Sequence, residues 1–233
     1  MGSRVTYEAE GPVAIVTMDD GKVNSLSLAM LSEVDGALDR AQDDRAVMVL
    51  TGREGVFSAG FDLPTLQAGG PGAIAMVRAG FELAHRLLSF PTPVVIACSG
   101  HAVAMGLFLV LSGDHRIGVQ GAAHKIVANE VAIGLTLPRA AIEICRERVD
   151  PGHLSRVMTL AETFSPDTAV GTGLLDGVVP SGELLATARA TGERLAGLDL
   201  DAHAATKLRV REQVLTRLRA AIESEQAEVL PGT

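Results

Sequence analysis

The chain has 233 residues, of which 47% are hydrophobic, so it is long enough to form one large domain around a substantial apolar core. A formal charge of −8 excludes a basic nucleic-acid-binding surface and disfavours docking to an anionic membrane. No apolar run approaches 18 residues, and the first residues lack the apolar segment of a secretory signal, so we expect a cytoplasmic protein without a membrane span.

The first half of the chain alternates between strand and helix patterns. Leu31, Val34 and Leu38 recur at helical spacing, whereas the run "AVMVLTG" is continuously apolar and rich in β-branched residues, as in a strand buried on both faces. This alternation predicts an α/β fold with a parallel sheet. In chain order, the patterns predict strands at 5–9 and 13–18, a helix at 28–44, a strand at 46–52, a helix at 73–88, a strand at 94–100, a helix within 101–115 and a strand at 115–120.

The second half is mostly helical. We expect helices at 138–148 and 151–160, and Ser165 followed by Pro166 marks the start of another. A long, charged amphipathic stretch occupies 199–227. We therefore divide the chain into a core at 1–195 and a C-terminal helical segment at 196–233, which either packs on its own domain as a solvated helix or contacts other subunits.

The sequence has no phosphate-binding loop, dinucleotide fingerprint, nucleophile elbow or His-rich metal spacing, so we expect neither a metal site nor a separate cofactor. Cys98 and Cys145 are far apart and in no metal-binding pattern, so we expect both to be reduced and buried.

Two glycine-bearing loops each follow a predicted strand and lead into a helix. They are "TGREGVFSAGFDL" at 51–63 and "CSGHAVAMGLF" at 98–108. Loops at the carboxyl ends of parallel strands often bind ligands, and their backbone N–H groups suit a developing oxyanion. Such loops are also common in structural roles, so spacing alone leaves both readings open.

At this point the motifs resemble those of the crotonase superfamily, the enoyl-CoA hydratases and isomerases. The similar segments occur in the same order along roughly residues 12–180. They are "FSAGFDL" at 57–63, "PVVIA" at 93–97 with Gly100, 101–114, 123–138, and 164–180.

The resemblance implies the family's spiral of ββα units, with C-terminal helices packing subunits into a homotrimer or a dimer of trimers. It also implies an acyl-CoA substrate from fatty-acid metabolism, with coenzyme A present only as part of that substrate. The two donors that hold the thioester oxygen would be the N–H groups of Phe61 and Met105, and the Ala59 carbonyl would meet the adenine amino group. Gly60 and Gly106 would line the same site.

Two departures from the family pattern bear on the reaction. Ala104-Met105-Gly106 stands where the family often has three glycines, so a residue that needs a positive φ would be strained. Phe108 stands where hydratases have the first of two glutamates that activate water. A phenyl ring can neither accept a proton nor orient water, so we expect no efficient hydration, which would be a lyase activity.

The second glutamate position is retained as Glu130, in a segment similar to the "N-E-x-x-L-G" of Δ3,Δ2-enoyl-CoA isomerases. The closest active-site pattern is therefore that of an isomerase with Glu130 as the sole acid and base. Apolar neighbours at 107–109 would exclude water and raise the pKa of this carboxyl.

Three alternatives stay open: a weak hydratase, an acyl-CoA hydrolase and a non-catalytic acyl-CoA-binding protein. We expect structural roles for Asp62, as a helix cap, and for Asp114. The same holds for the histidines that match no catalytic position of the family, which are His101, His115 and His124.

Overall fold

A computed structural model describes residues 3–228 and contains two sheets in that range. The larger sheet has the order β1-β2-β3-β5-β7-β9; β1 and β2 pair antiparallel and the other pairs are parallel. The smaller sheet, β4-β6-β8, is parallel throughout. The strands are β1 (Val5–Glu10), β2 (Val13–Met18), β3 (Val47–Gly52), β4 (Gly55–Ser58), β5 (Val94–Cys98), β6 (Gly100–Val103), β7 (His115–Val119), β8 (Ile126–Val127) and β9 (Gly177–Val179).

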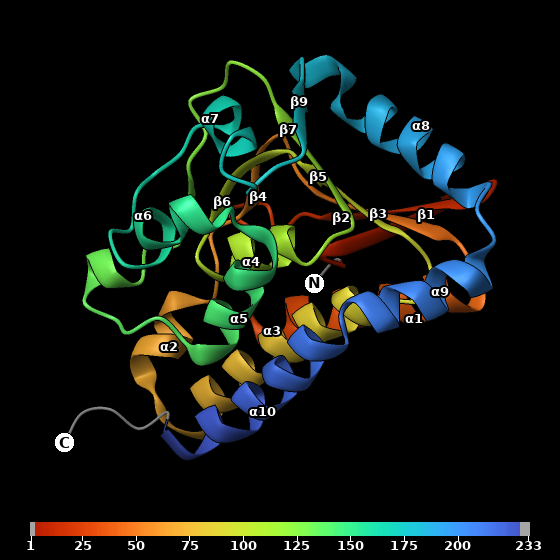
Figure 1. The fold of residues 1–233 in the computed structure, drawn as a ribbon. Helices are drawn as coiled ribbons and strands as arrows, with labels where there is room; N and C mark the ends of the chain where they lie inside the picture. The colour runs from red at the N-terminus through yellow and green to blue at the C-terminus, as the bar shows by residue number, and fades with distance from the viewer. Residues whose placement is uncertain (1–2, 229–233) are drawn as a thin grey trace.

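Three successive strands of the larger sheet each continue into a strand of the smaller one, and a helix then follows. This is the spiral of ββα units that the resemblance implied, and it is confirmed (Figure 1). The helices are α1 (Leu28–Asp43), α2 (Leu63–Ala68), α3 (Gly70–Ser89), α4 (Met105–Leu111), α5 (Arg139–Arg148), α6 (Leu154–Met158), α7 (Pro166–Val170), α8 (Leu184–Ala196), α9 (Leu200–Val210) and α10 (Glu212–Glu228), with short 3-10 turns at Val131–Ile133, Pro151–His153 and Ser181–Glu183.

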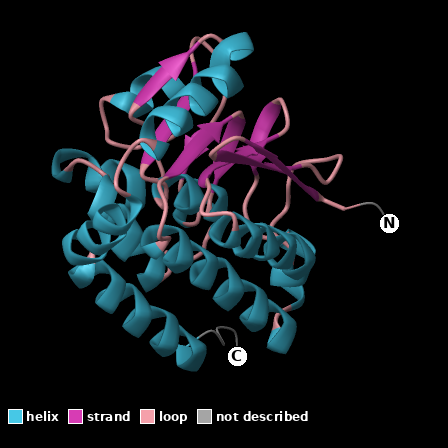
Figure 2. Cartoon of the chain, turned by 90° about the vertical axis from the view of Figure 1, so that its right-hand side faces the viewer, coloured by secondary structure: helices cyan, strands magenta, loops and turns pink. Residues whose placement is uncertain are grey.

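The larger sheet is covered on both faces, which explains why β3 is buried at every position. Met48 and Leu50 belong to the main core with α1 and α3, while Val47 and Val49 belong to a second apolar cluster closed by Leu184 and other residues of α8. Alternate residues of a strand point to opposite faces, so a continuous apolar run is what such a strand requires. Figure 2 shows a thick layer of helices below the strands and a smaller group above them.

Two expectations about local structure were wrong. The apolar run after residue 100 is not helical from its start, because Gly100–Val103 forms β6 and the helix begins only at Met105. The stretch at 199–227 is not one helix: α9 ends at Val210, and Arg211 separates it from α10. Within this chain α10 packs against α3 and α5, so part of the C-terminal segment completes the core. The division at residue 195 and the subunit contact stay predictions.

Among the described residues, no helix combines the length and apolar character needed to cross a membrane. The same residues contain no cluster of three or more His, Cys, Asp or Glu side chains arranged to hold a metal ion. Cys98 and Cys145 are free and buried, as expected, and burial raises the pKa of each thiol to about 12, which keeps both unreactive.

Candidate active site

The smaller sheet brings the predicted site residues to one edge. Its three strands are parallel, so their carboxyl ends lie together. Phe61 follows the end of β4 by three residues, Met105 follows the end of β6 by two, and Glu130 follows the end of β8 by three. The sheet therefore gathers the three residues that the sequence analysis named as catalytic.

The first two loops touch each other at Gly60. A Cβ added to Gly60 would lie 3.0 Å from the Ala104 methyl carbon, 3.0 Å from the Val103 carbonyl oxygen and 3.4 Å from the Met105 backbone nitrogen. Gly60 also has a φ of +90°, which side-chain-bearing residues rarely adopt. A glycine is required here for two reasons, and its presence allows the loop that carries Phe61 to lie against the start of α4.

Neither Phe61 nor Met105 gives its backbone N–H to any acceptor in the described part of the chain. The loop around Phe61 is held by its neighbour instead, because the Leu26 N–H donates to the Gly60 carbonyl at 2.8 Å. Ala59 is exposed, and no described residue donates to its carbonyl oxygen. Backbone N–H groups that have no acceptor within the protein are the kind of donor that stabilises a developing oxyanion.

The strain expected at the altered glycine triplet falls on Ala104. This residue has φ 51° and ψ −123°, a region that residues with a Cβ enter at a cost of about 1–3 kcal/mol. Its N–H donates to the Val127 carbonyl at 2.9 Å, and its carbonyl accepts from the N–H of Leu107 at 2.9 Å. These bonds fix the turn that starts α4 and tie it to β8, the strand that leads to Glu130.

Gly106 permits a second close approach of the same two loops. A Cβ at Gly106 would lie 2.4 Å from the Ser58 carbonyl oxygen and 2.9 Å from the Ser58 Cβ. Atoms do not pack at these separations, so any larger residue would push α4 away from β4. Gly106 thereby fixes the spacing of the two donor loops, and its predicted contact with substrate stays a prediction.

Glu130 is a buried carboxylate, and one of its two oxygens has no partner among the described residues. Only 8% of its surface is exposed, and its Oε2 atom is buried with no hydrogen-bond donor within the described residues. Burial raises the pKa of this carboxyl to about 7, as expected for a carboxylate among apolar groups. The Oδ1 atom of the preceding Asn129 is also buried and unpartnered in this part of the chain. A carboxyl with a pKa near 7 suits proton transfer in both directions at neutral pH.

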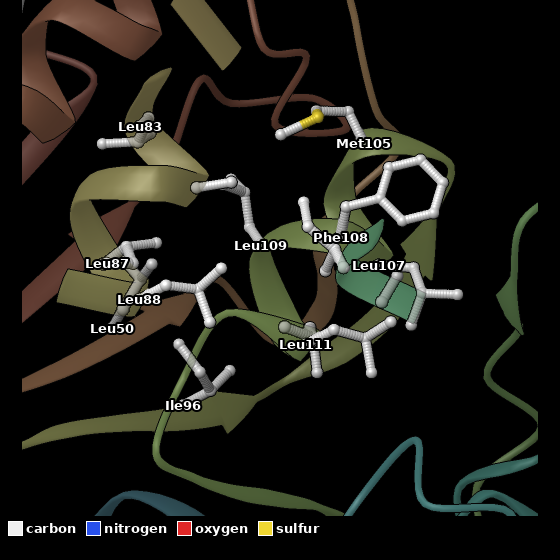
Figure 3. Close-up of a cluster of buried hydrophobic side chains, with 14 of the residues drawn as sticks. Leu50, Leu83, Leu87, Leu88, Ile96, Met105, Leu107, Phe108, Leu109 and Leu111 are labelled. Carbon is white, nitrogen blue, oxygen red and sulfur yellow. The ribbon is translucent and has the colours of Figure 1, made fainter. Parts of the chain in front are cut away.

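Phe108 lies in an aromatic cluster beneath the donor loops. It is 1% exposed and stacks on Phe81 with ring centroids 6.3 Å apart, and Phe81 meets Phe61 edge to face at 6.2 Å. Leu107 and Leu109 on either side are fully buried. Figure 3 shows the Phe108 ring near Met105, with leucines filling the space below. The first turn of α4 therefore presents an apolar wall.

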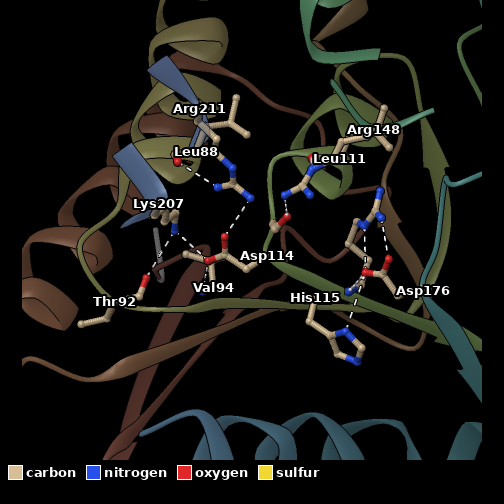
Figure 4. A network of polar contacts seen from close by, with 12 residues as sticks. Leu88, Thr92, Val94, Leu111, Asp114, His115, Arg148, Asp176, Lys207 and Arg211 are labelled. Carbon is tan, nitrogen blue, oxygen red and sulfur yellow. Dashed lines mark hydrogen bonds and ion pairs between the residues drawn. The ribbon is translucent and has the colours of Figure 1, made fainter. Parts of the chain in front are cut away.

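Two carboxylates outside the site are structural, as expected. Asp62 caps α2, because its side chain accepts from the Thr65 N–H at 3.1 Å. Asp114 accepts from the Lys207 ammonium at 2.7 Å and lies 2.9 Å from the Arg211 guanidinium (Figure 4). Burial opposes ionisation of Asp114, but these two cations keep its pKa below the ordinary value. This cluster anchors α9 and α10 to the core.

Of the three histidines named above, His101 and His115 have polar partners, whereas Nδ1 of His124 is buried with no hydrogen-bond partner among the described residues. His101 accepts from the Lys125 N–H at 2.8 Å through Nδ1, and its ring meets that of His124 edge to face at 5.3 Å. The Nδ1 atom of His115 lies 3.7 Å from an Asp176 oxygen. The structural roles expected for these histidines stay predictions. Sequence reasoning missed Gly80, whose only signal was a glycine inside a helical pattern, and where an added Cβ would meet Phe61 and Met105.

Comparison with known proteins places this geometry in a family. The family model for enoyl-CoA hydratase/isomerase matches residues 8–229. The structure of an enoyl-CoA isomerase from Mycobacterium tuberculosis is 45% identical, covers 98% of this chain and 100% of its own, and superposes with a TM-score of 0.94. Human mitochondrial Δ3,Δ2-enoyl-CoA isomerase is 28% identical, covers 98% of this chain and 92% of its own, and has a TM-score of 0.91.

Relatives described as hydratases are similar too. A probable enoyl-CoA hydratase from Rhodobacter capsulatus is 30% identical over 205 residues, which are 87% of this chain and 79% of the relative. Relatives of both kinds thus resemble this chain at comparable identity, and the reaction has to be inferred from the site itself. The family model covers nearly the whole sequence, and the fold agrees with it throughout: the chain belongs to the enoyl-CoA hydratase/isomerase family, whose members act on acyl-CoA thioesters.

Proposed function

We propose that the protein is a Δ3,Δ2-enoyl-CoA isomerase with Glu130 as its only acid and base. The observation that supports this most directly is the combination of a buried Glu130, whose Oε2 atom has no hydrogen-bond partner among the described residues, with an apolar Phe108. Hydration across C2–C3 needs two carboxylates to hold and activate water, whereas moving a double bond needs one group that takes a proton and returns it.

In the proposed reaction the Glu130 carboxylate removes a proton from C2 of a 3-enoyl-CoA. The electrons of that C–H bond form the C1=C2 bond of a dienolate, and negative charge collects on the thioester oxygen. The N–H groups of Phe61 and Met105 would donate to that oxygen and lower the barrier. Glu130 then returns the proton at C4, which leaves the double bond between C2 and C3. No atom is gained or lost, so no separate cofactor is required.

The apolar wall supports isomerisation for a second reason. A dienolate or its 2-enoyl product is exposed to competing reaction with water, and a dry site prevents this. Phe108 and its neighbours on α4 are buried side chains without polar atoms, so they provide no place for an ordered water. Burial of Glu130 itself explains the raised pKa of its carboxyl.

A substrate panel tests the proposal. Purified protein is incubated separately with 3-hexenoyl-CoA, 2-hexenoyl-CoA and hexanoyl-CoA, and the products are separated by chromatography. We expect the 3-enoyl substrate to become 2-enoyl-CoA, with little 3-hydroxyacyl-CoA and little free coenzyme A. Dominant hydration or thioester hydrolysis would instead support the hydratase or hydrolase alternatives. Tight binding without turnover of any substrate would support a binding protein.

The hydratase alternative has its own discriminating variant. If the site activates water weakly through Glu130, then Phe108→Glu would supply the second carboxylate and raise the rate of hydration. Our proposal predicts no such gain, because Phe108 is packed against Phe81 and a carboxylate there would enter the aromatic cluster. A Phe108→Gln variant of matched size, without the charge, controls for the effect of repacking.

We also propose that the chain assembles as a homotrimer or a dimer of trimers and that it acts in the cytoplasm. The proposed assembly is supported by the resemblance to the family. Analytical ultracentrifugation of the purified protein distinguishes three copies from six, and fractionation of the source cells tests the location.

A further inference from the structure

Gly80 forms a notch in the middle of α3 that the Phe61 ring enters and that the Met105 side chain borders. A Cβ at Gly80 would lie 2.5 Å from Cε1 and 2.6 Å from Cζ of the Phe61 ring, and 3.5 Å from Cγ of Met105. Real side chains do not approach within 3.0 Å, so the Phe61 ring occupies the space that any other residue at position 80 would need. We call Gly80 and the facing side chains of Phe61 and Met105 the Gly80 notch.

Gly72 in the same helix shows that the notch is specific to its position. A Cβ at Gly72 would meet nothing within 4 Å. Glycine inside a helix is unfavourable relative to alanine, so its presence at position 80 needs a local reason. The Phe61 ring provides that reason.

Phe61, whose ring enters the notch, and Met105, which borders it, both have N–H groups with no acceptor among the described residues. Met105 is fully buried, and the Phe61 ring is also held edge-on by Phe81, the residue after Gly80. A side chain wedged in this way restricts the backbone to which it is attached, because an aromatic ring has only two rotatable bonds. The family's usual glycine at position 105 would have no side chain to serve as an anchor.

We propose that Gly80 is a positioning residue that aligns the oxyanion donor of Phe61, acting through the ring of that residue. This inference rests on the proposed function in one respect: it takes the thioester oxygen of the substrate as the acceptor of the two N–H groups. It does not depend on Glu130 or on where a proton goes. Helix α3 is thus the support against which the loop that carries Phe61 is set.

The test compares Gly80→Ala with Gly72→Ala, which add the same methyl group to the same helix. The first readout is the ¹³C chemical shift of the carbonyl in [1-¹³C]hexanoyl-CoA bound to each protein, because hydrogen bonds to the oxygen polarise that carbonyl. We expect the wild type and Gly72→Ala to move the signal downfield from its position in free thioester. We expect Gly80→Ala to lose half or more of that movement.

The second readout is the kinetics of 3-hexenoyl-CoA isomerisation. Removing one oxyanion donor outright costs about 10²–10³-fold in kcat, so a displaced donor is expected to cost about tenfold. KM should change little, because the notch acts on the charge that develops during the reaction. Gly72→Ala should keep the kcat of the wild type.

Phe61→Leu provides a variant that adds no volume to the helix. It withdraws the ring from the notch, so it should weaken the carbonyl shift by itself, and adding Gly80→Ala to it should cause no further loss. The inference is overturned if Gly80→Ala keeps the carbonyl shift and kcat of the wild type, if its effect is undiminished in the Phe61→Leu background, or if the wild type does not shift the carbonyl. If the wild type shifts the ¹³C carbonyl signal but moves no double bond, the isomerase proposal is overturned and the inference about Gly80 is not.

Discussion

The ring of Phe108 stacks on that of Phe81, with centroids 6.3 Å apart and an angle of 26° between the planes. The contact joins α4 to α3 at the position where a hydratase would carry a carboxylate. Phe108 therefore contributes to the core and, in our account, also defines the reaction by leaving Glu130 without a second acid.

Truncation of Phe108 should be costly to stability. Phe108→Ala removes a fully buried ring and leaves a cavity, so we expect a loss of about 3–5 kcal/mol in the free energy of unfolding. Phe108→Leu keeps most of the volume and should cost less than about 1.5 kcal/mol. Urea denaturation followed by circular dichroism measures both. Equal stability of Phe108→Ala and wild type would mean that the ring is not packed as described.

The rate of isomerisation should rise with pH through the titration of Glu130. Burial raises the pKa of this carboxyl to about 7, and only its ionised form removes a proton from C2. We therefore expect kcat/KM for 3-hexenoyl-CoA to increase up to about pH 7 and then level off. A value of kcat/KM that is constant between pH 5 and 8 would show that the pKa of the base lies well below 7.

The same carboxyl should make stability depend on pH. Its folded pKa of about 7 lies above the ordinary 4.5, so between these values the folded state binds more protons than the unfolded state. Its contribution to stability is fully present below pH 4.5 and is lost as pH rises through 7. Glu130→Gln should remove this part of the slope, which denaturant titrations from pH 4.5 to 8 measure. Identical slopes for the two proteins would contradict the burial of Glu130.

Relief of strain at Ala104 should stabilise the protein. Ala104 has a positive φ of 51°, which glycine adopts readily. Ala104→Gly relieves the backbone strain, which should raise the free energy of unfolding by about 1–3 kcal/mol. The greater freedom of glycine in the unfolded chain lowers it by about 0.4–1 kcal/mol. We expect a net gain of about 1 kcal/mol in urea denaturation. Ala37→Gly, in the middle of helix α1, is the control and should be destabilising. A loss of stability in Ala104→Gly would contradict the strained turn.

The Asp114 cluster should be essential for attachment of the C-terminal helices. Asp114→Ala leaves the buried cations Lys207 and Arg211 without their carboxylate, so we expect a loss of about 3–5 kcal/mol. Asp201→Ala breaks the exposed pair with Arg45, which water and salt screen, so it should cost far less stability. Thermal unfolding of the two variants side by side measures the difference. Equal effects would show that the Asp114 pairs are as weak as surface pairs.

Five strands of the larger sheet could be predicted from their hydrophobic patterns, whereas β9, which spans only three residues, was not predicted. Strands β4, β6 and β8 were not predicted individually, since they span four, four and two residues and have no resolvable periodicity. Gly100–Val103 merged with the apolar helix that follows it, because the turn between them depends on the positive φ of Ala104. Only pairing with neighbouring strands separates the two elements.

The candidate site, too, could be predicted from the sequence only in part. Phe61, Met105 and Glu130 could be named from motifs that are local in sequence. The contacts that hold them could not, because their partners are remote: Gly80 faces Phe61 from another helix, and Val127 accepts from Ala104. The break between α9 and α10 was missed for a similar reason. Arg211 is bound to the Leu88 carbonyl and to Asp114, both about a hundred or more positions earlier in the chain.

The central claim is that Glu130 alone moves the proton, and the rate of 3-hexenoyl-CoA isomerisation by wild type and Glu130→Gln tests it most directly. Both proteins should bind hexanoyl-CoA with similar affinity, measured by calorimetry, since glutamine keeps the size of the side chain. The account predicts that the variant isomerises about 10²–10⁴-fold more slowly. Equal rates for the two proteins would contradict it.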